Sequence, residues 1–254
     1  MTIHASKHWS LGSVLVLVLS LGLVATAVAQ GATAPTMPSP GASAGPGWLG
    51  ANTEVYRDDF SMPSGWNIAD DDVGRTAYQH GGLAMSVAQD KTTLWDDHKL
   101  PDVHAVLRVE ALVSDLQGSG AAGVACGSSL GLQRYLFAAV NDGAEIVFGR
   151  IIDGRLQVID RRPLPEDVDP THVRVGIECA SVPEEGGDYA LVTLDGVPIT
   201  LPAFDIPVGP YDKATLVVSA DTAPLSVLFD DLVVHAGAVY APRGQDRDPS
   251  RPSA

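Results

Sequence analysis

Residues 103–113 read VHAVLRVEALV, and this stretch decides the fold class. Its odd positions are all apolar, while its even positions include His104, Arg108 and Glu110. Alternation of this kind is typical of a β-strand with one buried face and one wetter face. Residues 172–179 repeat the pattern, so the chain contains at least two long strands of a half-buried sheet.

Further strand-like runs follow one another through the central part of the chain. We expect strands at Leu83–Val87, Arg134–Val140, Ala144–Ile152, Leu156–Asp160, Tyr189–Leu194, Val197–Leu201, Ala214–Ala220 and Ser226–His235. Short turn signals separate several of them, such as Asn141-Asp142-Gly143, whose residues tolerate positive φ. We find no long amphipathic helix. The sequence therefore predicts an all-β domain over residues 51–236, built as a two-sheet antiparallel jelly-roll sandwich.

Two acidic motifs bracket this domain, and they suggest that its first and last strands meet. One is Tyr56-Arg57-Asp58-Asp59-Phe60, and the other is Leu228-Phe229-Asp230-Asp231-Leu232. Each places a carboxylate pair inside an apolar run, where a charge is costly unless another group pairs with it.

The two ends of the chain have a different character from its centre. Residues 1–29 contain the apolar run Leu11–Val24 and then Ala27-Val28-Ala29, which predicts a signal peptide and a secreted or extracytoplasmic protein. The alternative is an uncleaved membrane anchor. Residues 30–50 and 237–254 are rich in Gly, Ala, Pro and Ser, so we expect a flexible linker and a disordered tail.

The formal net charge of −15 limits the possible partners. Nucleic acids and anionic lipids are bound by basic surfaces, so neither is expected as a partner here. Acidity of this degree favours solubility outside the cell. Some of the carboxylates are alternatively candidates for calcium ligands, because calcium prefers oxygen atoms.

The two cysteines, Cys126 and Cys179, lie in strand-like runs. In an exported chain an even number of cysteines favours a disulfide, and two buried free thiols are the alternative. Neither cysteine has the spacing of a zinc site.

The order of the motifs resembles that of the concanavalin A-like lectin/glucanase superfamily. Within it, the chain is most similar to laminin-G-like and keto-disaccharide-hydrolase-like domains of exported bacterial proteins. The resemblance covers about residues 55–234. It rests on Asp58-Asp59-Phe60, Ser64-Gly65-Trp66, Asp70-Asp71-Asp72, Tyr78-Gln79-His80-Gly81-Gly82-Leu83, Gly123-Val124-Ala125-Cys126, Tyr135-Leu136-Phe137-Ala138, Arg174-Val175-Gly176-Ile177-Glu178-Cys179 and the closing run Val227–Val234.

The resemblance implies two curved antiparallel sheets, carbohydrate on the concave sheet, and in many members a structural calcium ion near the first and last strands. Asp230 matches the aspartate that helps to hold calcium in related glucanases, and Asp59 is its N-terminal counterpart by motif. Alternatively, these carboxylates cap turns or bind backbone amides. No cofactor is required by either interpretation.

The glucanases of this superfamily carry a Glu-x-Asp-x-x-Glu strand, which places a nucleophile and an acid on one face. This chain has no such run, which argues against glucanase activity. Sugar-binding surfaces combine aromatic rings with carboxylates and amides. The candidate ligand-binding residues are Trp95, Asp97, Arg134 and Tyr135.

Three functions remain open from the sequence. The first is a non-catalytic exported module that binds a glycan or a cell-surface partner. The second is a glycoside hydrolase of the keto-disaccharide hydrolase type, which does not depend on the missing motif. The third is a structural or adhesion module without a small ligand.

Overall fold

Thirteen β-strands and no helix make up the part of the chain that this computed structural model describes. That part consists of residues 50–129, 134–152, 155–182, 187–199 and 209–237. Within these ranges, therefore, no helix is long and apolar enough to cross a membrane. The predicted signal peptide, and the predicted linker and tail except for their residues Gly50 and Gly237, lie outside the described residues.

The strands are listed here in chain order. They are β1 (Thr53–Asp58), β2 (Ala69–Asp70), β3 (Gly74–Gln79), β4 (Gly82–Val87), β5 (Thr92–His104), β6 (Val106–Ser128), β7 (Arg134–Asn141), β8 (Glu145–Ile152), β9 (Arg155–Pro163), β10 (His172–Val182), β11 (Gly187–Leu194), β12 (Val197–Ile199) and β13 (Tyr211–Ala236). All the pairings between them are antiparallel.

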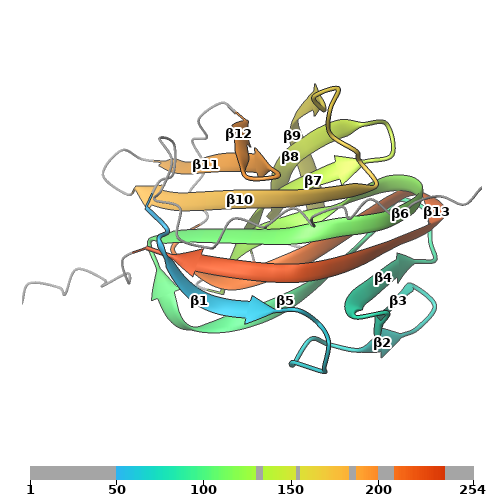
Figure 1. Cartoon of the computed structure of the whole chain (residues 1–254), viewed down its shortest axis with the longest axis horizontal. Coiled ribbons are helices and arrows are strands. Elements are labelled where there is room, and N and C mark those ends of the chain that lie inside the picture. The colour runs from blue at the N-terminus through green and yellow to red at the C-terminus, as the bar shows by residue number, and fades with distance from the viewer. Residues whose placement is uncertain (1–49, 130–133, 153–154, 183–186, 200–208, 238–254) are drawn as a thin grey trace, which may run out of the picture. The chain divides into compact units, whose positions relative to one another are not determined.

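The strands form two layers, which share the long strands β6 and β13 (Figure 1). Layer I follows the order β12-β11-β10-β6-β13, with β1 and the β4-β3-β2 strands beyond β13. Layer II follows the order β9-β8-β7-β6-β13-β5. The first half of β6 pairs with the second half of β13 in layer I, and the remaining halves pair in layer II. The predicted all-β sandwich is confirmed.

Both shared strands bend where they pass from one layer to the other. The register between β6 and β13 shifts repeatedly over Ala220–Leu228, which marks bulges at the bend. On β6 the bend contains Gly118, whose φ is +108°. A Cβ on Gly118 would lie 2.3 Å from the carbonyl oxygen of Pro224, so only glycine fits this close approach of the two backbones.

The main hydrophobic core lies between the two layers. Along β6 the inward positions include Val109, Val113 and Val124, all fully buried. Large side chains from the other strands complete this core, among them Phe60, Leu83, Leu136, Phe148, Ile177, Leu216 and Phe229. The alternation in the sequence therefore supplies one apolar face to each layer, and burial of these two faces holds the sandwich together.

Two of the predicted strand boundaries are wrong. The alternating run 103–113 is broken at Ala105, where the chain turns from β5 into β6. Residues 214–220 and 226–235 are not separate strands, because β13 continues through the bend between them. Alternation follows side-chain faces and does not show where a strand turns or crosses from one layer to another. Strands β2 and β3 and most of β5 were not predicted either.

A disulfide joins the two layers. Cys126 lies on the layer II half of β6, and Cys179 lies on β10 in layer I. Both side chains are fully buried in the main core. The predicted disulfide is confirmed, and it links strands that are 53 residues apart in the chain.

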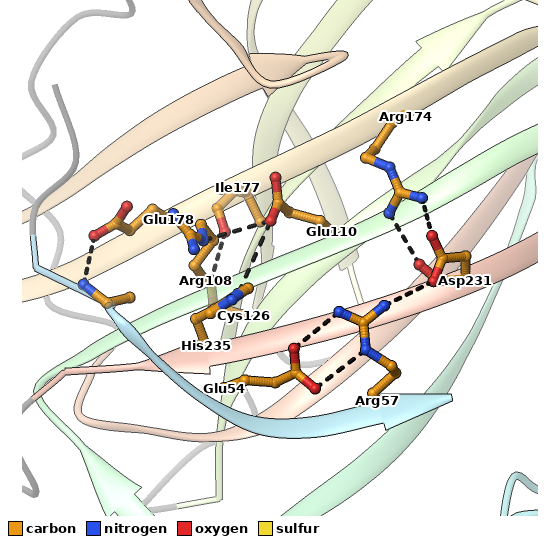
Figure 2. Close-up of polar contacts among 11 residues, drawn as sticks. Glu54, Arg57, Arg108, Glu110, Cys126, Arg174, Ile177, Glu178, Asp231 and His235 are labelled. Carbon is orange, nitrogen blue, oxygen red and sulfur yellow. Dashed lines mark hydrogen bonds and ion pairs between the residues drawn. The ribbon is translucent and has the colours of Figure 1, made fainter. Parts of the chain in front are cut away.

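The first and last strands meet, as the two acidic motifs suggested. Strand β1 pairs with the end of β13, with Asp58 opposite Leu232. Asp231 has a positive φ of 46° and lies within the bulge between Asp230 and Val233. There its carboxylate pairs with Arg57 of β1 at 3.0 Å and also with Arg174 of β10 (Figure 2). Three strands of layer I are therefore linked through one carboxylate.

Other polar and charged groups on the same face of layer I also lie close together (Figure 2). Glu54 binds Arg57 through two hydrogen bonds of 2.8 and 3.1 Å. His235 lies 4.0 Å from Glu110, and Arg108 lies 3.5 Å from the same carboxylate. The acids of this set each lie beside an arginine, so we regard the set as structural. Each of the exposed pairs contributes on the order of 0–1 kcal/mol.

The disulfide gives the first prediction. Closing a loop of 53 residues stabilises the fold by about 4 kcal/mol, because it reduces the entropy of the unfolded chain. Reduction should therefore shift the urea unfolding midpoint strongly downward. The Cys126→Ala/Cys179→Ala double variant is the control, since reductant should not affect it. If reductant leaves the urea unfolding midpoint of the original protein unchanged, the bridge is absent.

His235 gives the second prediction, which concerns pH. Burial, followed by the nearby Arg108 charge, lowers the pKa of His235 from 6.5 to about 4. The fold therefore favours the neutral imidazole. The stability that this contributes is complete above pH 6.5 and is lost as the pH falls from 6.5 towards 4. Between pH 7.5 and pH 5 the loss should be about 1 to 2 kcal/mol.

Urea unfolding at both pH values would measure this loss in the original protein and in His235→Gln. The difference in stability between the two proteins isolates His235 from all other titrating groups. His172→Gln is a matched control, because His172 is exposed on β10. If the original protein and His235→Gln lose stability in parallel, the assignment to His235 is wrong.

Candidate functional site

Three of the four predicted ligand-binding residues lie on the outer face of layer II, which is the face turned away from layer I. Trp95 and Asp97 are two residues apart on β5, so they point to the same side. Asp97 lies opposite Thr215 on β13. Tyr135 on β7 and Lys213 on β13 both lie opposite Gly127 of β6, one on each side of it.

Asp97 is the centre of a polar cluster on this face. Its Oδ2 accepts hydrogen bonds from Tyr135 Oη at 2.7 Å and from Lys213 Nζ at 2.9 Å. Its Oδ1 accepts one from Thr215 Oγ1 at 2.8 Å. The side chains of Asp97 and Lys213 remain 23% and 11% exposed. The cluster is therefore preorganised, and part of it is accessible.

Burial and hydrogen bonding set the protonation of this cluster. Burial, strengthened by the hydrogen bond to Asp97, raises the pKa of Tyr135 to about 12, so the phenol stays a neutral donor. Burial lowers the pKa of Lys213, but its hydrogen bonds to Asp97 and Tyr135 outweigh that effect and the net pKa is raised. The lysine is a stable cation at neutral pH.

The cluster depends on Gly127, the residue between Tyr135 and Lys213. A Cβ at Gly127 would lie 2.5 Å from the tyrosine ring and 3.1 Å from the lysine Cβ. The lysine Nζ reaches to 3.1 Å from the tyrosine hydroxyl and 5.4 Å from the ring centroid. The missing side chain at Gly127 is what allows the two residues to meet.

Arg134 does not join the other three predicted residues. It directly precedes Tyr135 on β7, and adjacent residues of a strand point to opposite faces. The sequence could not show which of the two shares a face with Asp97. The pairing of β7 with β6 decides that question in favour of Tyr135.

A second, smaller apolar cluster covers the rest of the outer face of layer II. Its buried members are Ala125, Tyr135, Phe137, Ala139, Val147, Ile151 and Val217, and Trp95 is partly buried against them. A hollow of about 50 Å³ lies beside Phe137 and Ala139. Polar groups of Asn141, Arg161 and Asp221 border this hollow. The face thus combines an aromatic and aliphatic surface with polar groups at both ends.

Asp97 and Asp221 both lie on this face, but they are far apart; Glu145, which shares the face with Val147 on β8, accepts a hydrogen bond from Asn141 Nδ2 at 2.9 Å. Asp97 is opposite Thr215, and Asp221 lies six residues further along β13, which corresponds to about 20 Å of strand. Glycosidases need two carboxyl groups about 5 to 9.5 Å apart. Asp97 and Asp221 therefore cannot act as a hydrolytic pair.

The predicted calcium residues bind neighbouring groups of the chain. Asp59 accepts hydrogen bonds from the backbone nitrogen and the hydroxyl of Ser61 at 3.0 and 2.7 Å. Asp230 Oδ1 accepts one from the backbone nitrogen of Asp231 at 2.6 Å. Among the described residues, no three His, Cys, Asp or Glu side chains lie together as a metal site. Calcium binding at Asp59 and Asp230 stays a prediction.

The neighbouring Asp58 has a structural role that the sequence did not reveal. Its carboxylate is buried and accepts hydrogen bonds from Tyr56 Oη at 3.0 Å, Trp66 Nε1 at 2.8 Å and the backbone nitrogen of Phe60 at 2.8 Å. The hydroxyl of Ser64 binds the same group. Asp58 thus anchors the segment between β1 and β2, and Trp66 belongs to the core.

Lys213 and Thr215 are the members of the Asp97 cluster that sequence reasoning missed. Lys213 directly precedes the predicted strand Ala214–Ala220, and Thr215 lies near its start. Their alternation with the apolar Ala214 and Leu216 could have identified them. The alternation marks them as facing away from the core. It does not show that β5 lies beside them, because that pairing joins residues more than 100 positions apart.

A scan against protein-family models and a search of the curated proteins find no match for this chain. Solved structures do match its fold. One is a beta-glucanase of Bacillus licheniformis, with a TM-score of 0.53 and 10% identity over 74% of this chain and 99% of that one. Another is a lichenase from a mouse hindgut metagenome, with a TM-score of 0.51 and 12% identity over 74% of this chain and 100% of that one.

A third is a Bacillus subtilis protein with a galectin-like fold, at a TM-score of 0.51 and 15% identity over 74% of this chain and 98% of that one. Identities this low establish the fold alone. The chain therefore has the two-layer β-sandwich fold of the concanavalin A-like lectins and glucanases.

Proposed function

We propose that this protein is an exported, non-catalytic module that binds a glycan on the outer face of layer II. The observation that carries the proposal is the meeting of Trp95, Asp97 and Lys213 on one face, beside an apolar hollow. Sugars are bound by apolar and aromatic surfaces that pack against ring faces, with polar groups that bind the hydroxyls.

Each group has a distinct part in the proposed site. Trp95 is half-buried, and its exposed part offers a surface for stacking. Asp97 accepts hydrogen bonds from hydroxyl groups of the sugar and Lys213 donates hydrogen bonds to them, because both side chains remain partly exposed. Tyr135 is fully buried, so it orients Asp97 and does not stack on a sugar.

The face favours an extended glycan over a single sugar. Tyr135 and Asn141 are six residues apart along β7, so the polar groups near them are separated by about 20 Å of strand. Polar groups occur near both ends, with the apolar surface between them. A chain of several sugar rings matches such a surface better than one ring does.

Hydrolysis is the less favoured alternative. A hydrolase of the keto-disaccharide type needs reactive groups that converge on one bond. On this face Asp97 is held by three donors and lies far from Asp221. The disulfide supports export, because disulfides persist in oxidising compartments.

The proposal predicts glycan binding that depends on Asp97 and Trp95. The full chain should bind a subset of oligosaccharides on a glycan array. Asp97→Asn and Trp95→Ala should each weaken that binding by about tenfold or more, because each removes a central contact. Isothermal titration with the strongest array ligand would measure the change.

Asp102→Asn is the matched control, since Asp102 is an exposed aspartate on the same strand. It should bind as the original protein does. Release of new reducing ends from the bound glycan would contradict the non-catalytic part of the proposal. The absence of any array ligand, or equal binding by Asp97→Asn, would contradict the site.

A further inference from the structure

A cavity of about 200 Å³ lies at one edge of the sandwich, between β5 of layer II and the β2–β3 strands of layer I. Its lining includes Asn67, Arg75, Thr76, Leu94, Trp95 and Asp96. Strand β5 is an edge strand, because among the described strands it pairs only with β13. The cavity therefore occupies the gap beside an unpaired strand edge.

Asp96 is the unusual group in this cavity. It lies opposite the core residue Leu216, so it points to the inner side of layer II, opposite to Asp97. Asp96 is only 7% exposed. Among the residues that the structure describes, none donates a hydrogen bond to Asp96 Oδ2. A buried carboxylate oxygen without a donor is costly for the fold.

The cost is visible in the protonation of Asp96. Burial raises the pKa of Asp96 from 3.8 to about 6, although the backbone groups of Asn67 and Asp97 partly offset it. The carboxylate is still largely ionised at neutral pH. A ligand that donates hydrogen bonds to Oδ2 would supply the donor that this buried oxygen lacks.

The other polar groups of the cavity indicate what kind of ligand fits. Thr76 contributes a hydroxyl, and its residue is 5% exposed. Asn67, Asp71 and Arg75 are exposed residues that also line it. Arg75 directly precedes Thr76 on β3, so its side chain and that of Thr76 point to opposite faces. The Asp96 carboxylate accepts hydrogen bonds and the Thr76 hydroxyl both donates and accepts them, so the pair matches the hydroxyl groups of a ligand. Asp71 and Asp96 are the two carboxylates of the lining, and among the described residues no group of three His, Cys, Asp or Glu side chains could hold a metal ion.

Size restricts the ligand further. The cavity has a volume of about 200 Å³. It is smaller than the pockets of roughly 300–1,000 Å³ that hold drug-sized ligands. Leu94 and Met85 supply an apolar wall. One small ring with several hydroxyl groups meets these conditions.

The surrounding residues hold the cavity in shape. Trp66, which precedes Asn67, donates its indole hydrogen to Asp58 at 2.8 Å. His98, two residues after Asp96 on β5, stacks on Tyr56 with ring centroids 3.7 Å apart. These contacts fix both Asn67 and β5, so the site is largely preformed.

We propose that this edge cavity binds one hydroxyl-rich ring of monosaccharide size, with Asp96 accepting hydrogen bonds from the hydroxyl groups of the ligand. Trp95 borders both sites, but their carboxylates are distinct, because Asp96 and Asp97 point to opposite sides of layer II. Variants of Asp96 and of Asp97 therefore test the two proposals separately.

The test uses the full chain labelled with nitrogen-15 and four probes, D-glucose, D-galactose, D-mannose and D-fructose. At least one probe should shift the backbone amide signals of Asn67, Thr76 and Asp96 in a saturable way. Asp96→Asn should weaken that binding by about tenfold or more, because it removes an ionised acceptor. Thr76→Val should weaken it several-fold, and the exposed Asp102→Asn should not change it.

The unfolding temperature is a second measurement on the same variants. Asp96→Asn should unfold at a higher temperature than the original protein at pH 7.5, because it removes a buried charge. Such a variant is folded, so its loss of sugar binding cannot be attributed to misfolding. The proposal is overturned if none of the four sugars shifts these amides, or if Asp96→Asn binds as well as the original protein. It is also overturned if calcium, and no sugar, shifts them through Asp96.

Discussion

The pairing of β6 with β13 is the constraint on which the rest of the structure depends. These strands pair with each other in both layers and pass together through the bend. Their backbone hydrogen bonds therefore continue from one layer into the other, and each remaining strand builds outward from this pair. The bend requires glycine at position 118, because the two backbones approach too closely for a side chain. The disulfide between Cys126 and Cys179 adds a covalent link between the same layers.

Several carboxylates lie within or directly beside the strands, and each has different hydrogen-bond partners. Asp58 is surrounded by donors and anchors the segment after β1. Asp231 is turned by a bulge towards two arginines on neighbouring strands (Figure 2). Asp97 is held by a lysine and two hydroxyl groups. Asp96 alone among these four has a buried oxygen without a donor in the described part of the chain, and it faces a cavity. The unsatisfied carboxylate is therefore the one that points to a ligand.

Strand β5 links the two proposed sites. Because successive side chains of a strand alternate, Trp95 and Asp97 lie on the outer face while Leu94 and Asp96 face inward. One edge strand thus contributes to an extended surface on one side and to a small cavity on the other. The sequence Trp95-Asp96-Asp97 drew attention to this strand, but it favoured Asp97 only. The difference between the two aspartates lies in what packs against them: Lys213 and Thr215 for one, and the cavity for the other.

The sequence by itself determined the all-β class, the inward faces of most strands and the two cysteines that pair. These features follow from local alternation and composition, which are readable over a few residues. Only the tertiary structure decided that β6 and β13 pass from one layer to the other. It also decided the separation of Arg134 from Tyr135 and the presence of Lys213 beside Asp97. All of these depend on which strands become neighbours, and that choice is made by long-range packing of apolar faces between segments far apart in the chain.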